Sequence, residues 1–364
     1  MAPDRRRARQ EALVRALAAE ELDGLLVTSR ANIRYLTGFS GSAALVMVTR
    51  GDVLLVTDFR YDEQARAEAG AVARIEVEGT SVWDRFFKEL PTLGPLAAPG
   101  YEAHALTVHD AERFAQAGKA WRWKPTTELV ERLRVAKDEG EVAAIKSAAT
   151  LAGEALRRTL TELRPAMTEL EIAGRLEGAL RALGSEGHPF ATIVASGPRT
   201  ALPHARSSRR VVAAGDWVLL DFGAQVDGYC ADITRTVVVG GHATERQRAL
   251  YGLVYEAQQR ARAGVRAGMS GRDADALARE PIAARGFGEA FGHSLGHGLG
   301  LEVHEAPRLA KTNPDPLPAG AVVTIEPGVY VAREGGVRIE DDVLLAPEGP
   351  VLLSDGRTEL LELV

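Results

Sequence analysis

Two aspartates, Asp221 and Asp232, stand on either side of a predicted β-hairpin, where they could hold a metal ion. The apolar run over residues 216–220 predicts a buried strand that ends at Asp221, and residues 233–239 predict the strand that returns after Asp232. Between these strands, Asp227-Gly228 is a strong signal for a two-residue hairpin turn.

The register of this hairpin decides whether the two carboxylates meet. The two-residue turn pairs Val226 with Tyr229 and Gly223 with Asp232. Asp221 lies two residues from Gly223, so it points to the same face and becomes a diagonal neighbour of Asp232. Two carboxylates buried side by side repel each other and lose hydration, so one or two divalent cations would stabilise the pair. Taken alone, the segment also fits a surface hairpin with two ordinary aspartates.

A glycine-rich segment over residues 286–300 offers a further ligand. His293 and His297 are four residues apart, as in the helical zinc motif of many proteases, but no glutamate separates them. Gly292 and Gly296 also disfavour a helix there, which excludes that motif. Glycines beside a histidine do allow close backbone approach to an ion. The alternative for His297 is an ordinary loop histidine.

Two acidic residues near the end of the chain complete the set of candidates. Glu326 follows a buried strand predicted over residues 321–325, where an unpaired carboxylate would be costly. Arg338 and Glu340 alternate with apolar residues in a strand predicted over 337–345, so both point to one face. The alternatives are a turn glutamate that reaches solvent and the solvated face of an edge strand.

Four carboxylates and one histidine make an oxygen-rich donor set. Such a set suits Mn²⁺ or Co²⁺ better than an ion that prefers thiolates. Bridging carboxylates suit two ions roughly 3.5–4 Å apart, an arrangement that lowers the pKa of a shared water and polarises a scissile carbonyl. A carboxylate beside that water could take its proton.

Composition narrows the class of protein. The chain has 364 residues, 46% of them hydrophobic, which predicts a soluble protein of two domains or one large one. The net charge of −6 provides no electrostatic footprint for nucleic acid. The only cysteine is Cys230, which favours a reducing compartment, and we expect the cytoplasm. No apolar run is long enough to predict a membrane span or a signal peptide.

The pattern of elements changes near residues 125–131, so we expect an N-terminal domain over residues 1–127 and a second domain over residues 128–364. In the first domain, alternating strands and helices predict an α/β fold, although residues 32–39 resemble an irregular turn. In the second, pairs of long helices are followed by β-ribbons, and this order occurs twice. That repetition predicts an α+β domain of two similar halves, with helices over residues 137–163, 168–183, 243–265 and 270–285.

Five motifs in the second domain resemble the Xaa-Pro aminopeptidase and prolidase branch of the pita-bread metallopeptidases. Two further segments resemble the N-terminal domain of that family. The resemblance therefore implies a pita-bread catalytic domain of the creatinase/aminopeptidase type, preceded by a creatinase-like α/β domain. The five motifs are LPHA (202–205), DFGAQVDGYCADITRT (221–236), FGHSLGHGLGLEVHE (291–305), TIEPGVY (324–330) and GVRIEDDVL (336–344), and the two N-terminal segments are NIRYLTGFSGS (32–42) and TDFRYDEQA (57–65).

The resemblance implies a ligand set for two divalent ions, with Mn²⁺ expected and Co²⁺ or Zn²⁺ as alternatives. Asp232 and Glu340 would bridge both ions, Asp221 would bind one, and His297 the other. Glu326 would be both a ligand and the general base for the shared water. A homodimer is expected from the family alone.

The resemblance also implies roles for residues around the ions. His204, His293 and His304 would position the substrate and stabilise the tetrahedral intermediate or the leaving nitrogen. Arg338 would help hold Glu340 and the substrate end of the site. Without the resemblance, an ordinary loop or core residue is the favoured interpretation of each of these histidines.

Within the family, the large N-terminal domain disfavours a methionine aminopeptidase. The complete ligand set disfavours a non-catalytic peptide-binding relative and a metal-free hydrolase of creatine-like molecules. We expect an aminopeptidase that removes the residue before a proline, with a dipeptidase of Xaa-Pro substrates as the alternative. Proline lacks an amide hydrogen, so a shallow apolar slot can select it, and the candidate wall residues are Phe190, Ile193 and Tyr229.

Overall fold

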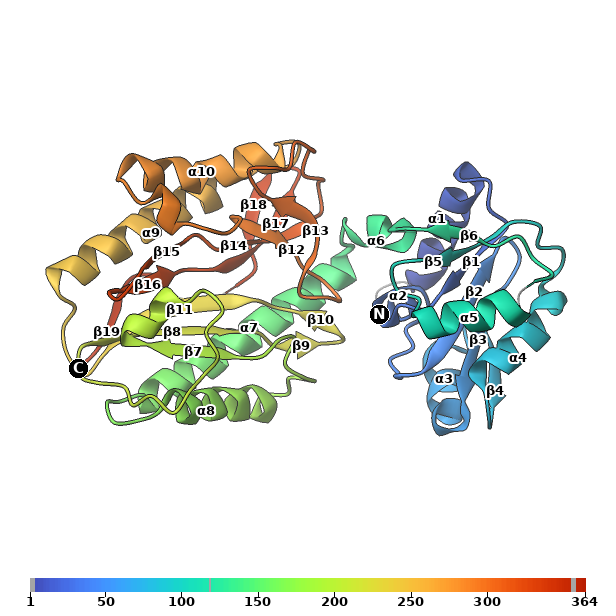
Figure 1. Cartoon of the computed structure of the whole chain (residues 1–364), viewed down its shortest axis with the longest axis horizontal. Coiled ribbons are helices and arrows are strands. Elements are labelled where there is room, and N and C mark those ends of the chain that lie inside the picture. Colours follow the sequence, from blue (N-terminus) through green and yellow to red (C-terminus); the bar gives the residue numbers. More distant parts are fainter. Residues whose placement is uncertain (1–3, 118, 355–357) are drawn as a thin grey trace. The chain divides into compact units, whose positions relative to one another are not determined.

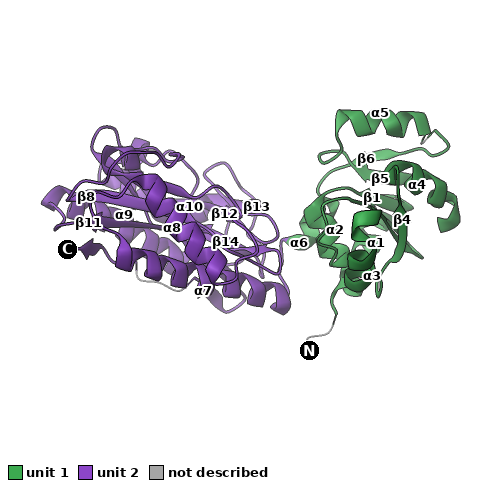
Figure 2. Ribbon diagram, turned by 90° about the horizontal axis from the view of Figure 1, so that it is seen from below, with its two compact units in different colours: residues 1–134 green, residues 135–364 purple. Residues whose placement is uncertain are grey.

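The computed structural model describes residues 4–117, 119–354 and 358–364. The chain divides into two compact units, Met1–Arg134 and Val135–Val364 (Figure 2). This division falls a few residues after the predicted boundary at 127/128, because helix α6 (Leu129–Arg134) packs on the first unit. Leu129 and Val130 are buried there, and the hydroxyl of Tyr35 donates to the carbonyl of Leu133 at 3.1 Å.

The first unit is a six-stranded mixed sheet with helices around it. The strand order is β4-β3-β2-β1-β5-β6, in which β1, β2 and β3 are antiparallel neighbours and the outer pairs are parallel. The predicted α/β fold is therefore confirmed. Its elements are α1 (Arg6–Ala19), β1 (Gly24–Val27), α2 (Arg30–Thr37), β2 (Ala44–Thr49), β3 (Val53–Asp58), α3 (Asp62–Ala69), β4 (Arg74–Glu78), α4 (Val82–Glu89), β5 (Pro99–Glu102), α5 (Val108–Ala117), β6 (Lys124–Thr126) and α6.

The prediction of an irregular turn over residues 32–39 is wrong, because most of that segment forms helix α2. Asn32 disfavours a helix in isolation, but here it is fully buried and its amide donates to Glu102 at 2.6 Å. Gly38 ends the helix in the left-handed conformation with a φ of 81°, which glycine adopts without strain. Tertiary contacts thus override the local preference.

The second unit consists of two halves, each a pair of helices on a sheet (Figure 1). The sheet of the first half has the order β19-β11-β8-β7, and that of the second β13-β12-β14-β17-β18, with β15 and β16 as a separate ribbon. The elements are α7 (Glu139–Glu162), α8 (Glu169–Ala182), β7 (Ile193–Ser196), β8 (Asp216–Phe222), β9 (Gln225–Val226), β10 (Tyr229–Cys230), β11 (Ile233–Val239), α9 (Glu245–Gly264), α10 (Gly271–Ala284), β12 (Gly296–Gly298), β13 (Glu305–Leu309), β14 (Val322–Ile325), β15 (Gly328–Val331), β16 (Gly335–Arg338), β17 (Asp341–Ala346), β18 (Gly349–Leu352) and β19 (Leu361–Leu363).

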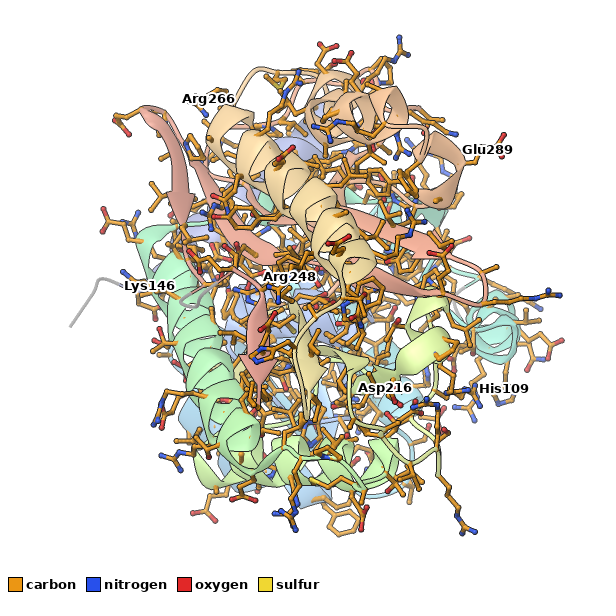
Figure 3. The ribbon with its side chains drawn as sticks, turned by 90° about the vertical axis from the view of Figure 1, so that its left-hand side faces the viewer. His109, Lys146, Asp216, Arg248, Arg266 and Glu289 are labelled. Atoms are coloured by element: carbon orange, nitrogen blue, oxygen red, sulfur yellow. The ribbon has the colours of Figure 1, made fainter. Side chains whose placement is uncertain are left out.

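The helices of the second unit lie outside and the strands between them (Figure 1). Helices α7 and α8 share one hydrophobic core with β7, β8 and β11, and α9 and α10 share another with β14 and β17. The outward faces of these helices carry charged side chains such as Lys146 on α7 and Arg248 on α9 (Figure 3). None of the helices in the described part of the chain combines the length and apolar character that a bilayer crossing requires.

The predicted hairpin register is confirmed on both sides of the turn. Val226 pairs with Tyr229, and further along Asp221 pairs with Thr234. The single strand predicted over residues 337–345 is wrong, because the chain leaves one sheet and enters another at residues 339–340. There β16 pairs with β15, whereas β17 pairs with β14. This break lies at Glu340.

Candidate metal centre

Three of the predicted ligands converge in the second unit. Asp232, His297 and Glu340 each place one ligand atom within 4.8 Å of the other two. Asp232 directly precedes β11, His297 lies on β12, and Glu340 lies between β16 and β17. The site is therefore built where the sheets of the two halves meet.

The His297 imidazole is oriented by the backbone next to it. Its Nδ1 lies 3.0 Å from the carbonyl oxygen of Gly298, so Nδ1 carries the proton and Nε2 is left free to bind an ion. This Nε2 lies 3.8 Å from a carboxylate oxygen of Asp232 and 3.3 Å from one of Glu326. Gly296 permits the close packing, since a Cβ there would lie 1.9 Å from the carbonyl oxygen of Thr324.

Glu326 joins the group at the end of β14. The hydroxyl of Thr324 lies 3.2 Å from Glu326 Oε1 and accepts from the backbone amide of His297 at 3.1 Å. One threonine therefore connects two of the expected ligands.

Asp221 forms an ion pair with Arg338. Nη2 of Arg338 lies 2.5 Å from Asp221 Oδ2, and the guanidinium also donates to Thr234, to the hydroxyl of Tyr330 and to the carbonyl of Pro203. Arg338 reaches Glu340 through Thr234, whose hydroxyl accepts from the guanidinium and donates to Glu340. The same guanidinium forms an ion pair with Asp221.

Glu340 is held by two residues of β11. The Thr234 hydroxyl donates to Glu340 Oε2 at 2.6 Å, and Arg235 Nη1 donates to the Glu340 carbonyl at 2.5 Å. Arg235 also forms a buried ion pair with Asp341 at 2.8 Å. These contacts stabilise the chain where it changes sheets.

The electrostatics of the site favour a bound cation. Burial, and then the neighbouring carboxylates, raise the pKa of Asp232 and of Glu340 well above the usual range. Burial also raises the pKa of Glu326 to about 8 and lowers the pKa of His297 to about 4. Asp232 Oδ1 is buried, and no donor among the described residues reaches it. An orphaned carboxylate oxygen among mutually repelling acids, beside a neutral imidazole, fits a divalent metal ion.

Three more histidines surround this group. His293 Nε2 lies 2.9 Å from the Tyr330 hydroxyl, and the His304 ring lies 4.4 Å from that of His297. Burial lowers the pKa of His293 to about 4, and the charges of Arg338 and Arg279 lower it further. The pKa of His304 is also lowered, chiefly by burial and then by the charge of Arg308. His204 is exposed and directly follows Pro203, whose carbonyl oxygen accepts from Arg338 at 3.3 Å.

Sequence reasoning missed the residues that orient the ligands. Tyr330 connects His293 to Arg338, and Thr234 contacts both Arg338 and Glu340. Both lie inside motifs that the sequence brings to attention. Their roles depend on pairings between distant strands, which the sequence does not reveal.

Two of the three residues proposed to line a proline slot, Phe190 and Ile193, lie near Asp221. Ile193 pairs with Asp221 across β7 and β8, and the ring of Phe190 packs over Gly223. The third residue, Tyr229, points away from the slot. Its ring is buried and its hydroxyl donates to Glu141 at 2.9 Å.

Comparisons with known proteins agree with this geometry. Residues 143–347 match the model of metallopeptidase family M24, and residues 9–136 match the creatinase/prolidase N-terminal domain. The chain belongs to metallopeptidase family M24. Its fold is therefore an N-terminal creatinase-type domain followed by a pita-bread catalytic domain, as the sequence predicted. Membership in family M24 implies divalent metal ions.

The similar proteins include both Xaa-Pro dipeptidases and an X-Pro aminopeptidase. The solved structure of an Xaa-Pro dipeptidase from Bacillus anthracis has a TM-score of 0.93 at 40% identity, covering 98% of this chain and 100% of that one. An X-Pro aminopeptidase from Thermotoga maritima has a TM-score of 0.90 at 38% identity, covering 97% and 99%. An Xaa-Pro dipeptidase of Pyrococcus furiosus is 34% identical over 97% of this chain and 99% of its own.

Proposed function

We propose that this M24 metallopeptidase hydrolyses the bond between a first residue and a following proline. The observation that carries the proposal is the group of Asp232, His297 and Glu340, which includes the orphaned Oδ1 of Asp232. Asp221 and Glu326 would complete the ligand set for two divalent ions. The oxygen-rich donors favour Mn²⁺, with Co²⁺ and Zn²⁺ as alternatives.

When bound, the ions would acidify a water toward neutrality and polarise the scissile carbonyl. Glu326 is placed to take the proton of the attacking water, because its Oε1 lies 3.3 Å from Nε2 of His297 and therefore beside the ions that would bind there. Its side chain is partly exposed, at 16%, so a substrate can reach it. The Thr324 hydroxyl would hold the carboxylate in place.

The surrounding donors would orient the substrate. Arg338 donates to the hydroxyl oxygen of Tyr330 at 2.7 Å, and that hydroxyl can donate to His293. His293 Nδ1 lies 2.8 Å from the Ser294 carbonyl, so the proton sits on Nδ1 and Nε2 accepts. This chain holds His293 beside Glu326, from which it is 4.0 Å away. We assign His204 and His304 to the same side of the substrate.

The proline preference rests on shape and on a missing donor. Proline has no amide hydrogen, so a site that offers no acceptor to that nitrogen loses nothing by binding it. Phe190 and Ile193 present apolar surface next to Asp221, where a pyrrolidine ring could pack.

Two substrate lengths compete within this proposal. The aminopeptidase hypothesis takes support from the similar Thermotoga maritima protein, and the dipeptidase hypothesis from the Bacillus anthracis and Pyrococcus furiosus proteins. The test is to assay the metal-loaded protein on Xaa-Pro and on Xaa-Pro-Xaa side by side. Faster cleavage of the tripeptide supports the aminopeptidase, and cleavage of the dipeptide alone supports the dipeptidase. Tight binding of both without cleavage would support a peptide-binding relative instead.

We also propose a homodimer located in the cytoplasm. The dimer rests on resemblance to the family, and the reducing compartment on a single buried cysteine. Light scattering at micromolar concentration tests the first, and a monomer would contradict it.

A further inference from the structure

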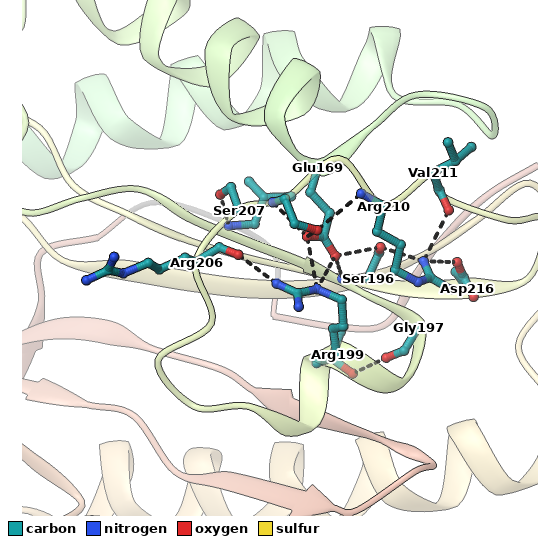
Figure 4. Close-up of polar contacts among 12 residues, drawn as sticks. Glu169, Ser196, Gly197, Arg199, Arg206, Ser207, Arg210, Val211 and Asp216 are labelled. Atoms are coloured by element: carbon teal, nitrogen blue, oxygen red, sulfur yellow. Dashed lines mark hydrogen bonds and ion pairs between the residues drawn. The ribbon is translucent and has the colours of Figure 1, made fainter.

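Glu169 is a fully buried carboxylate outside the metal centre. It occupies the first position of α8, where the Thr168 hydroxyl and Glu171 already form a capping box. Its side chain leaves the helix and enters the loop that connects β7 to β8 (Figure 4). A buried carboxylate destabilises the fold unless hydrogen-bond donors surround it, so the donors around Glu169 indicate its role.

Three residues of that loop and its entry satisfy the Glu169 carboxylate. Oε1 accepts from the backbone amide of Ser196 at 2.8 Å and from its hydroxyl at 2.9 Å. Oε2 accepts from the amide of Ser208 at 3.0 Å and from its hydroxyl at 2.6 Å. Nε of Arg199 lies 3.1 Å from both oxygens. The carboxylate therefore connects the start of the loop to its end.

The opposite side of the loop contacts the strand that carries Arg338. The backbone amide of Gly336 donates to the Thr200 hydroxyl at 2.7 Å, and Arg338 donates to the carbonyl of Pro203 at 3.3 Å. The loop is thus held between a buried anion on one side and the metal-site strand on the other.

His204 lies at the middle of this loop, between Arg199 and Ser208. Its side chain is exposed, and the described residues make no hydrogen bond to its ring. The position of the imidazole therefore depends on the backbone that carries it. Ser196 pairs with Val218, three residues from Asp221, which separates Glu169 from the metal ligands by roughly 10 Å of strand.

We propose that Glu169 is a positioning residue that acts through the 197–210 loop. By clamping Ser196, Arg199 and Ser208, its carboxylate holds the loop in which Pro203 contacts Arg338, and so fixes His204, the next residue, on the side of the metal centre. The proposal rests on the function proposed above for His204.

Hydrogen exchange provides a test that does not depend on turnover. Full-length, metal-loaded protein is compared with Glu169→Gln, with Ser208→Ala and with the control Glu171→Gln. Glutamine serves as well as glutamate in a capping box, so the control preserves the helix end two residues away. We expect amides of residues 197–210 to exchange at least about tenfold faster in Glu169→Gln, since bonds to a charged acceptor are lost. Ser208→Ala should show a smaller increase, and Glu171→Gln none.

Measurements of kcat and KM then test whether the loop acts through His204. In Glu169→Gln we expect kcat to fall up to about 100-fold with KM nearly unchanged, the cost of a slightly misplaced group. Combined with His204→Ala, the substitution should add little further loss, because the two residues serve one function.

Unchanged exchange in both Glu169→Gln and Ser208→Ala would overturn the proposal, as would fully additive losses with His204→Ala. If Glu169→Gln does not fold, Ser208→Ala decides. If the wild-type protein cleaves no Xaa-Pro substrate, the proposed function fails, and exchange alone still decides whether Glu169 orders the loop.

Discussion

Asp232 is the side chain whose surroundings most clearly indicate a bound cation. Its carboxylate is buried beside those of Glu340 and Asp221, its pKa is raised by burial and by those acids, and one oxygen has no donor among the described residues. A residue kept in that state destabilises the metal-free fold. Its presence is explained by an ion that satisfies the orphaned oxygen and offsets the repulsion.

Replacing Asp232 by asparagine should abolish metal binding. We expect hydrolysis to fall at least about 100-fold, because an ion supplies several kcal/mol of transition-state stabilisation. The unfolding free energy of the metal-free protein should not decrease, because the substitution relieves repulsion. Asp227→Asn, in the exposed turn of the same hairpin, is the matched control. Calorimetric metal titration and urea unfolding provide the measurements, and wild-type metal affinity in Asp232→Asn would refute the ligand assignment.

Cys230 should be nearly inert in the folded protein. Burial, and then the carboxylates of Glu305 and Asp232, raise the pKa of its thiol to about 12, so the reactive thiolate is scarce at pH 8. We expect a disulfide reagent to label the native protein at least about 100 times more slowly than the urea-unfolded protein. Rapid native labelling would show that the thiol is open to solvent.

At the scale of elements, the break between β16 and β17 shapes the site. The chain leaves the β15–β16 ribbon and enters the β14–β17 ladder. Glu340 lies between them and is paired in neither ladder. Asp341, the next residue, is buried and binds Arg235 on β11 and both Gln258 and Arg262 on α9. This network joins the two halves directly behind the metal ligands.

Asp341→Ala should therefore be strongly destabilising. It removes the carboxylate that pairs with the buried Arg235, and breaking a buried ion pair in this way costs about 3–5 kcal/mol. Urea unfolding measures the loss. Glu348→Ala, in the exposed turn that follows β17, should change stability by less than about 0.5 kcal/mol. Similar stability of the two variants would contradict the importance of the network.

Short sequence patterns correctly predicted the features that depend on neighbouring residues alone. The hairpin register follows from Asp227-Gly228, and the helix predicted over residues 168–183 agrees with α8. The strand break at Glu340 was missed because the alternation of Val337 to Ile339 continues smoothly through it. The role of Glu169 was missed too, since an acid in the first turn of a helix is ordinary until the fold buries it.

At the scale of the whole molecule, all candidate ligands belong to the second unit, Val135–Val364. The sequence motifs named five candidate ligands, but they cannot show that Asp221 forms an ion pair with Arg338. Neither can local sequence reveal that Tyr229 turns toward α7, because that depends on how the hairpin packs.

Metal removal should lower the melting temperature, because an ion that binds only the folded protein stabilises it. At a metal concentration of 100 times Kd the gain is about 2.7 kcal/mol. For a unit of this size that corresponds to a shift of roughly 5–10 °C. Scanning calorimetry with and without a chelator measures it. Asp232→Asn should show no shift, and a metal-induced shift in that variant would place the ion elsewhere.

The most direct measurement is the hydrolysis of an Xaa-Pro substrate by metal-stripped protein before and after Mn²⁺, Co²⁺ or Zn²⁺ is added. Our account predicts no turnover without metal and recovery with at least one ion, together with no recovery in Asp232→Asn. Turnover that resists the chelator, or no turnover although metal is demonstrably bound at this site, would contradict it.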